Sequence, residues 1–296
     1  MFATAVSRLV VDNLLTESQF ALPDPTTRNY RVDVVVTFLG VPVFSRKAVG
    51  KAFCTFREAV TGDHRVIALH FAGGSNPERT HGFKYDGSME EAIVEQGASR
   101  SQAAYFGFVT HSKNENFDQA RQRILDKTTG GGYTAAQGVH RAGCARCEKA
   151  SISLPDQHRE LAELIQQVRD RFPDSDRITT ELHTPSSPAA PTFLYAILSA
   201  LRSGQSRSEI GYVHNAKEYR LEWERSAEQS SGVSATRFTG CVLSASAHGL
   251  TTFRLWLNNQ SDLPMRIEFQ PRSYLRLSLE CEPAEPRSTP ISTEET

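Results

Sequence analysis

The sequence has few cysteines, almost no net charge and no long apolar run. Its five cysteines in 296 residues are too few, and odd in number, for a disulfide framework. The formal net charge of −1 gives no electrostatic reason to expect binding to nucleic acid or to an anionic membrane. Arg8 and Asp12 interrupt the apolar part of the N-terminus, and no other stretch is long enough to span a bilayer. We therefore expect a soluble cytoplasmic protein without a signal peptide or a membrane span, whose oligomeric state the sequence does not indicate.

Most of the chain carries the pattern of β-strands. An apolar share of 39% and a charged share of 23% are typical of a globular protein. Strands are predicted at 30–44, 47–60, 64–74, 103–111, 209–214, 217–224, 236–246, 250–258, 264–270 and 273–280. The stretch "MRIEFQ" alternates apolar and polar side chains, which predicts a sheet with one dry face and one wet face. Short turns between neighbouring strands favour antiparallel pairing.

Helical patterns are fewer and interrupt this series of strands. Helices are predicted at 3–18, 114–127, 154–172 and 192–203, while 88–95 fits either a helix or a strand. The glycine-rich stretch 128–151 is interpreted as a flexible connection. The predicted fold is α+β, a large curved, half-barrel-like antiparallel sheet packed on a few helices. Its organisation is a helix and linker over 1–27, one β-rich domain over 28–281 with an insertion at about 112–175, and a disordered tail over 282–296.

One part of the chain resembles a known kind of protein. The "FLYAILSALR" helix and the run "FRLWLNNQSDLPMRIEFQPRSYLRLSLE" are similar to the closing part of an uncharacterised family of bacterial β-rich domains. Those domains are themselves similar to lipoprotein carriers, in which a curved antiparallel sheet wraps a helix and shelters an apolar ligand. The resemblance covers mainly residues 185–281 and implies a carrier, without catalytic residues.

The loop "FAGGSNPERTHGFKYDG" at 71–87 is the first candidate site. A Gly-Gly-Ser turn can leave backbone N–H groups free to bind an anion, and Ser75 and Arg79 would assist. Glu78 and His81 lie three residues apart and would act as acid and base. The alternative is that the glycines and prolines only build a long hairpin loop.

The second candidate is a C-x-x-C motif at Cys144 and Cys147. Together with His140 and His158, these thiols would supply four ligands for a tetrahedral zinc ion, the one cofactor that the sequence indicates. A redox dithiol and two unreactive loop thiols are the alternatives.

The third candidate is the polar side of the last strands. Arg254 and Arg266 would bind a carboxylate there, and Trp256 would stack on a ligand. Cross-strand ion pairs on a solvated face are the alternative.

These candidates lead to three functional hypotheses. The first is a protein that binds a small, largely apolar molecule in a cavity of the curved sheet. The second is an enzyme of the same cavity, which would carry out cyclisation, isomerisation or hydrolysis with Glu78, Arg79 and His81. The third is a zinc-stabilised interaction module at Cys144 and Cys147.

Overall fold

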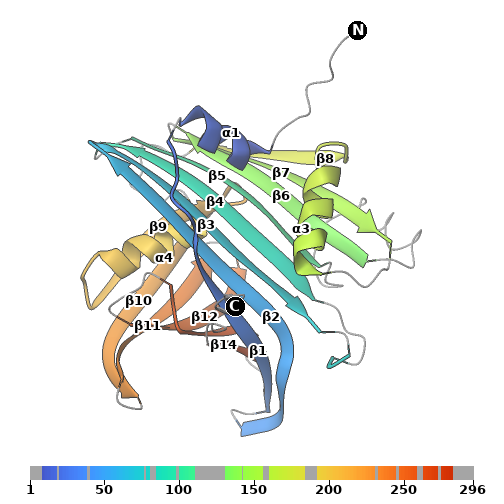
Figure 1. Ribbon diagram of the computed structural model, residues 1–296, viewed down its shortest axis with the longest axis vertical. Coiled ribbons are helices and arrows are strands. Elements are labelled where there is room, and N and C mark those ends of the chain that lie inside the picture. Colours follow the sequence, from blue (N-terminus) through green and yellow to red (C-terminus); the bar gives the residue numbers. More distant parts are fainter. Residues whose placement is uncertain are drawn as a thin grey trace, which may run out of the picture.

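A computed structural model of the chain shows one open antiparallel sheet of 14 strands (Figure 1). The structure describes residues 9–18, 20–38, 41–76, 78–80, 85–97, 100–110, 131–141, 143–155, 160–183, 192–230, 233–244, 247–258, 263–272 and 275–282. Three helices belong to this described part: α1 (Val10–Glu17), α3 (Leu161–Arg171) and α4 (Phe193–Arg202). The prediction of a large curved antiparallel sheet packed on a few helices is confirmed.

The strands follow one another in two series. The first series is β1 (Thr26–Phe38), β2 (Val41–Thr61), β3 (His64–Ser75), β4 (Asp86–Gln96), β5 (Arg100–Thr110), β6 (Gly131–Arg141), β7 (Cys144–Leu154) and β8 (Arg177–His183). The second is β9 (Arg207–His214), β10 (Lys217–Ser230), β11 (Val233–Ser244), β12 (Ala247–Leu257), β13 (Arg266–Arg272) and β14 (Leu275–Cys281). Within each series, consecutive strands pair as neighbours.

The two series join where the first strand meets the last. Tyr30 of β1 lies opposite Cys281 of β14, and this antiparallel register continues to Val36 and Leu275. The strand order therefore places β8 and β9 at the two opposite edges of the sheet. Because α4 connects these two edges in sequence, the chain must cross from one end of the sheet to the other at this helix.

The sheet folds around α4 (Figure 1). Ala196 and Ala200 of α4 pack in a cluster with residues of β9 to β12, among them Leu221 and Phe238. Leu198 packs on the other half of the sheet, against Ile67 of β3 and neighbouring strands. The face that contacts α4 is named the inner face from here on.

Helices α1 and α3 cover part of the opposite, outer face. Leu14 of α1 and Val168 of α3 share one core cluster with Phe106 and other residues of β4 to β7. Arg169 of α3 binds both Asp12 of α1, at 2.8 Å, and Glu90 of β4. This arginine ties both helices to the sheet while its guanidinium lies 5.7 Å from the ring centre of Phe106.

Tight turns hold the hairpins in register. Gly62, with φ +63°, stands in the loop between β2 and β3, where a residue with a side chain would be strained. Asn215 and Ala216, with φ +53° and +51°, form the two-residue loop between β9 and β10. Two positive φ angles in such a loop are typical of a type I′ turn, whose twist matches that of the paired strands.

Several element predictions need correction. The interpretation of 128–151 as a flexible connection is wrong, because 131–141 and 144–154 form the strands β6 and β7. Residues 88–95 belong to strand β4, and sequence analysis missed β8. Helices were predicted correctly around α1, α3 and α4, although α1 and α3 begin later than expected. Residues 114–127 and 283–296 lie outside the described part, so the predicted helix and tail stay predictions.

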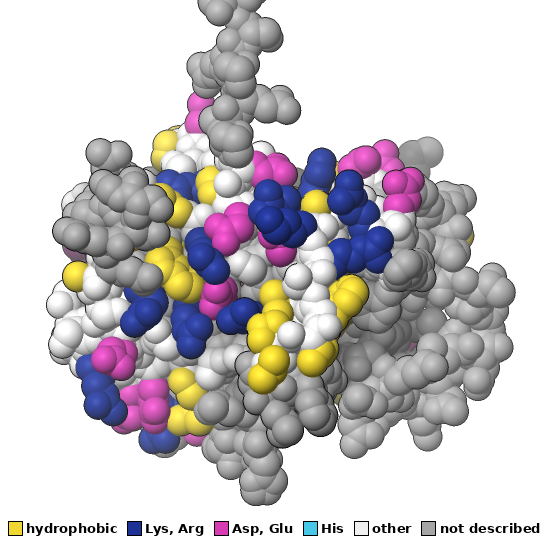
Figure 2. Space-filling model, turned by 90° about the horizontal axis from the view of Figure 1, so that it is seen from below, with side chains coloured by type: hydrophobic (Ala, Val, Ile, Leu, Met, Phe, Trp, Pro, Cys, Tyr) yellow, Lys and Arg dark blue, Asp and Glu magenta, His cyan; other side chains and the backbone are white. Residues whose placement is uncertain are grey.

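The surface carries charges of both signs. Figure 2 shows Lys and Arg interspersed with Asp and Glu on the face seen from below, with apolar side chains gathered beside them. Large exposed apolar residues include Val41, Val43 and Phe44 at the start of β2. None of the described helices is both long and apolar enough to cross a membrane.

Candidate functional site

The inner face of β4 and β5 carries polar side chains inside an otherwise apolar surface. Side chains alternate along β4, so Glu90 points to Arg169 on the outer face while Glu91 points to α4. Glu91 lies opposite Tyr105 of β5 in the sheet register. These inner polar groups are the candidate functional site, because charged side chains are rarely buried without a partner or a role.

Glu91 is fully buried and caps the first turn of α4. Its carboxylate accepts hydrogen bonds from the backbone N–H groups of Leu194, at 3.1 Å, and Tyr195, at 3.2 Å. Burial raises the pKa of the Glu91 carboxyl to about 7, although the hydrogen bond from the Leu194 N–H opposes this shift. The carboxyl is therefore poised to gain or lose a proton near neutral pH while it holds the helix to the sheet.

Tyr105 and Cys147 meet the turn between β9 and β10. The Tyr105 hydroxyl donates a hydrogen bond to Oδ1 of Asn215 at 3.1 Å, and the Cys147 thiol donates to the same oxygen at 3.7 Å. The Tyr105 ring lies over Gly138 of β6, where a Cβ atom would come within 2.4 Å of it. The glycine thus leaves the space that lets Tyr105 reach across to the other half of the protein.

His214 completes this group, which we name the inner polar cluster: Glu91, Tyr105, Cys147, His214 and Asn215. The rings of His214 and Tyr105 lie 4.9 Å apart, and Nδ1 of His214 is buried without a hydrogen-bond partner among the described residues. Burial, with a smaller contribution from Lys149, lowers the pKa of His214 to about 4, so the ring is neutral at pH 7.

Burial also keeps the other groups of the cluster uncharged. It raises the pKa of the Tyr105 hydroxyl above its usual range, and it raises the pKa of the Cys147 thiol. A thiol with a raised pKa is a poor nucleophile, because the thiolate is the reactive form. The inner polar cluster is therefore suited to hydrogen bonding and not to thiolate chemistry.

An apolar surface lies next to the cluster on the same face of the sheet. Its buried members are Tyr30, Ala52 and Leu279, and its half-buried members are Val32, Cys54, Phe71, Ile267, Leu277 and Cys281. We name this set the apolar inner surface; no described helix residue belongs to it. Phe71 lies opposite Met89 of β4, which packs with Tyr105 and Cys147, so the apolar surface leads to the polar cluster.

The predicted loop at 71–87 has a different geometry from the expected one. Gly73 and Gly74 lie inside β3 and pair with both β2 and β4, so the prediction of free backbone N–H groups there is wrong. Ser75 ends the strand and accepts a hydrogen bond on its hydroxyl from the Tyr85 N–H, at 2.7 Å. The glycines serve strand pairing and not an anion-binding turn.

Glu78 and Arg79 follow in an exposed turn. The N–H of Glu78 donates to Oδ1 of Asn76, and the N–H of Arg79 donates to the carbonyl of Asn76. Both side chains are exposed to solvent. His81 lies outside the described residues, so its pairing with Glu78 as acid and base stays a prediction.

The C-x-x-C motif lies on strand β7 and not in a loop. Neighbouring side chains of a strand point to opposite faces, so two residues three apart cannot share a face. Cys147 points to the inner face, where it contacts Asn215, while Cys144 points to the outer face. The two thiols therefore do not converge on one ion.

The histidines do not restore a zinc site within the described residues. His140 lies opposite Ala145 in the β6–β7 register, which places it on the inner face with Cys147 and away from Cys144. His158 lies outside the described residues. In the part of the chain that the structure describes, no group of three or more His, Cys, Asp or Glu side chains is arranged to hold a metal ion.

Arg254, Trp256 and Arg266 come together on the outer face. The Arg266 guanidinium lies 4.7 Å from the ring centre of Trp256, and Glu268 bonds to Arg266 at 2.6 Å and to Arg254 at 3.2 Å. Arg266 also contacts Glu280 of β14 at 3.0 Å. These contacts match the alternative of cross-strand ion pairs that hold β12, β13 and β14 together, and a ligand-binding role of the three residues stays a prediction.

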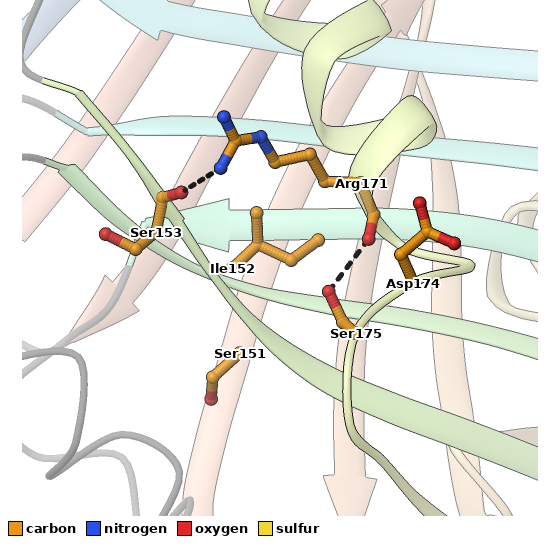
Figure 3. Close-up of a pocket in the computed structure, with 6 residues that line it drawn as sticks. All are labelled: Ser151, Ile152, Ser153, Arg171, Asp174 and Ser175. Atoms are coloured by element: carbon orange, nitrogen blue, oxygen red, sulfur yellow. Dashed lines mark hydrogen bonds between the residues drawn. The ribbon is translucent and has the colours of Figure 1, made fainter.

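A surface hollow of about 450 Å³ lies between β7 and the turn after α3 (Figure 3). Arg171 donates to the carbonyl of Ser153 at 3.3 Å, and the Ser175 hydroxyl donates to the carbonyl of Arg171 at 2.8 Å. Ser151, Ile152 and Asp174 complete the lining. Only Ile152 in this lining is apolar, so the hollow does not suit an apolar molecule.

Sequence reasoning missed the inner polar cluster. Glu91 lies in the stretch that fitted either a helix or a strand, so its facing could not be assigned, and Tyr105 and His214 lie in predicted strands without a distinctive motif. The "HNAK" turn at 214–217 was the one local signal, because Asn tolerates positive φ angles. No family model matches this chain, and no curated protein matches it significantly in sequence.

Proposed function

We propose that this protein binds a small, largely apolar molecule on the inner face of its curved sheet. The observation that carries the proposal is the apolar inner surface, where half-buried Val32, Phe71 and Leu277 belong to a cluster that includes no described helix residue. Apolar side chains that are only partly covered within a concave sheet are typical of ligand sites. The resemblance of residues 185–281 to carrier-like domains points in the same direction.

The inner polar cluster would bind the polar end of the molecule. Phe71 and Met89 connect the apolar inner surface to Tyr105 and Cys147. The buried Nδ1 of His214, which has no hydrogen-bond partner within the described part of the chain, offers a hydrogen-bonding atom there, since buried polar groups normally have partners. Because His214 and Tyr105 are neutral, we expect the polar end of the bound molecule to be a hydrogen-bonding group, such as a hydroxyl or a carbonyl, and not a group that reacts with a thiolate.

A matched pair of variants on β1 tests the proposal. Val32 belongs to the apolar inner surface, whereas Val35, three residues along the same strand, faces the outer side opposite Arg276. We would titrate wild type, Val32→Asn and Val35→Asn with the hydrophobic fluorophore N-phenyl-1-naphthylamine. We expect Val32→Asn to weaken binding by about tenfold or more, because a polar group then faces the bound probe, and Val35→Asn to leave it unchanged.

Native mass spectrometry of the purified protein gives an independent measurement. An organic adduct that is lost on denaturation, and is depleted in Val32→Asn, would support the proposal and give the mass of the ligand. The proposal fails if the wild type binds no probe and carries no adduct, or if both valine variants weaken binding equally. Far-UV circular dichroism checks that both variants are folded.

A further inference from the structure

Strand β8 is an exposed edge of the sheet. It pairs with β7 over Arg177–His183 and forms one end of the strand order, as Figure 1 shows. Six of its seven residues are exposed, and only Leu182 is half-buried. Ile178 is 48% exposed, so an apolar side chain is also accessible along this edge.

No described residue pairs with the free side of β8. The N–H and C=O groups on that side, unpaired within the described residues, form a template for another strand, and natural proteins usually protect such an edge with Pro, Lys or a bulge. The seven residues, RITTELH, contain neither Pro nor Lys, and their register with β7 has no shift. The other edge strand, β9, is better protected, because Tyr212 and Val213 are buried.

The charges of β7 and β8 alternate along one side of this edge. Arg177 contacts Glu148 at 3.2 Å, and Glu181 lies opposite Arg146 of β7 at 3.9 Å. Arg177, Thr179 and Glu181 project from the same face of β8, because alternate residues of a strand share a face. The strand thus presents a positive charge two positions before Thr179 and a negative charge two positions after it.

We propose that β8 pairs with β8 of a second copy of this chain, antiparallel and with a two-fold axis at Thr179. In this register Arg177 of each copy faces Glu181 of the other, Ile178 faces Thr180, and Thr179 faces itself. The order of charges across the interface becomes Glu148, Arg177, Glu181 and Arg146, the last two from the second copy. Every neighbouring pair has opposite signs, and both sheets continue as one.

The register is specific in its charges. A shift of the axis by one residue to Thr180 would place Arg177 opposite His183 and Glu181 opposite Thr179, without an ion pair. A single strand pair buries little area, so we expect a reversible dimer in the micromolar range and not a permanent one. Part of the attraction comes from half-exposed charges, so added salt should weaken it.

Charge exchange tests the proposal. We would measure wild type, Arg177→Glu, Glu181→Arg, their equimolar mixture and the double variant by sedimentation velocity at roughly 5 to 200 μM, a range suited to a small interface. Each single variant places like charges opposite each other and should be monomeric. The mixture restores two opposite-sign pairs between different chains and should dimerise, as should the double variant.

Two further variants separate the interface from effects within one chain. Glu148→Gln removes the ion pairs of Glu148 with Arg177 and Arg146 within one chain but changes no residue of β8. Its dimerisation should therefore stay within about twofold of the wild type. Thr179→Arg brings two arginines together at the two-fold axis and should abolish the dimer without any complementary partner. This variant keeps the proposal testable if a charge-reversed chain does not fold.

The inference is overturned if the wild type stays monomeric over the whole range of concentration. It is also overturned if Arg177→Glu and Thr179→Arg dimerise as well as the wild type, since the interface then lies elsewhere. Failure of the mixture to dimerise, with both single variants folded and monomeric, would overturn the register at Thr179. None of these results bears on ligand binding at the inner face, so the two proposals fail independently.

Discussion

Ionisation of Glu91 should make the protein less stable as the pH rises through neutrality. Its carboxyl is fully buried at the first turn of α4, where two backbone N–H groups donate to it. Hydrogen bonds and the helix N-terminus both favour the charged form, whereas loss of hydration disfavours it. Burial outweighs the other two effects, because the pKa of Glu91 rises from 4.5 to about 7.

The sign and size of the effect follow from this shift. Between about pH 4.5 and 7 the folded protein keeps a proton that the unfolded chain releases, so rising pH favours unfolding. The contribution of protonated Glu91 to the free energy of unfolding is fully present below the pKa of Glu91 in the unfolded chain, and it is lost as the pH passes the pKa of Glu91 in the folded protein. A pKa change from 4.5 to about 7 corresponds to about 3 kcal/mol of unfolding free energy.

The variant Glu91→Gln isolates this contribution. Its amide oxygen can still accept one of the two hydrogen bonds, but the side chain cannot ionise. We would measure urea unfolding of wild type and variant at about pH 5 and about pH 8, followed by far-UV circular dichroism. Relative to wild type, the variant should gain about 2.5 kcal/mol of unfolding free energy between these two pH values, slightly less than the full effect because pH 5 lies above the unfolded pKa.

A control on the same strand guards against general effects of amide substitution. Glu95 stands near the end of β4, half-buried and 3.5 Å from Arg65, and Glu95→Gln, measured at the same two pH values, is the reference for the effect of amide substitution itself. Parallel stability curves for wild type and Glu91→Gln would refute the reasoning. A variant that loses more stability at the higher pH would show that the helix N-terminus outweighs burial.

Two further predictions concern packing and charge. Gly138→Val should destabilise the protein by about 1–3 kcal/mol or more and shift Tyr105, because its Cβ would lie 2.4 Å from that ring. Thermal unfolding and tyrosine fluorescence measure these two effects, and an unchanged melting temperature would contradict the prediction. Arg169→Met should lower the free energy of unfolding by about 2–4 kcal/mol, since it removes the arginine that pairs with half-buried Glu90 and with Asp12. If urea unfolding shows a loss of stability no larger than that for substitution of an exposed arginine, these ion pairs do not stabilise the fold.

The sequence was informative wherever the structure depends on local patterns. Alternation in "MRIEFQ" places Ile267 and Phe269 on the inner face and Arg266 and Glu268 on the outer face, as the structure has them. The helix at α4 follows from its apolar periodicity, and Gly204, with φ +71°, ends it. Strands β6 and β7 were missed because their glycines and small residues have low strand propensity, which cross-strand pairing overrides.

The candidate site was less accessible, because its residues come from distant parts of the chain. Glu91 and Leu194 are 103 positions apart, and Tyr105 and Asn215 are 110 positions apart. The C-x-x-C motif shows the converse case, in which close spacing misleads. Its two thiols would converge in a loop but diverge in a strand, so the motif alone could not decide between these arrangements.

By itself, the sequence determined a β-rich chain, the two faces of its last strands and the helix that lies against them. Those properties depend on side-chain periodicity and turn residues, which act over a few positions. Only the tertiary structure decided that β1 pairs with β14, that the sheet folds around α4, and that Glu91, Tyr105, His214 and Asn215 share its inner face. Such contacts depend on the curvature and strand order of the whole sheet, which arise from many non-local pairings at once and leave no mark in a short stretch of sequence.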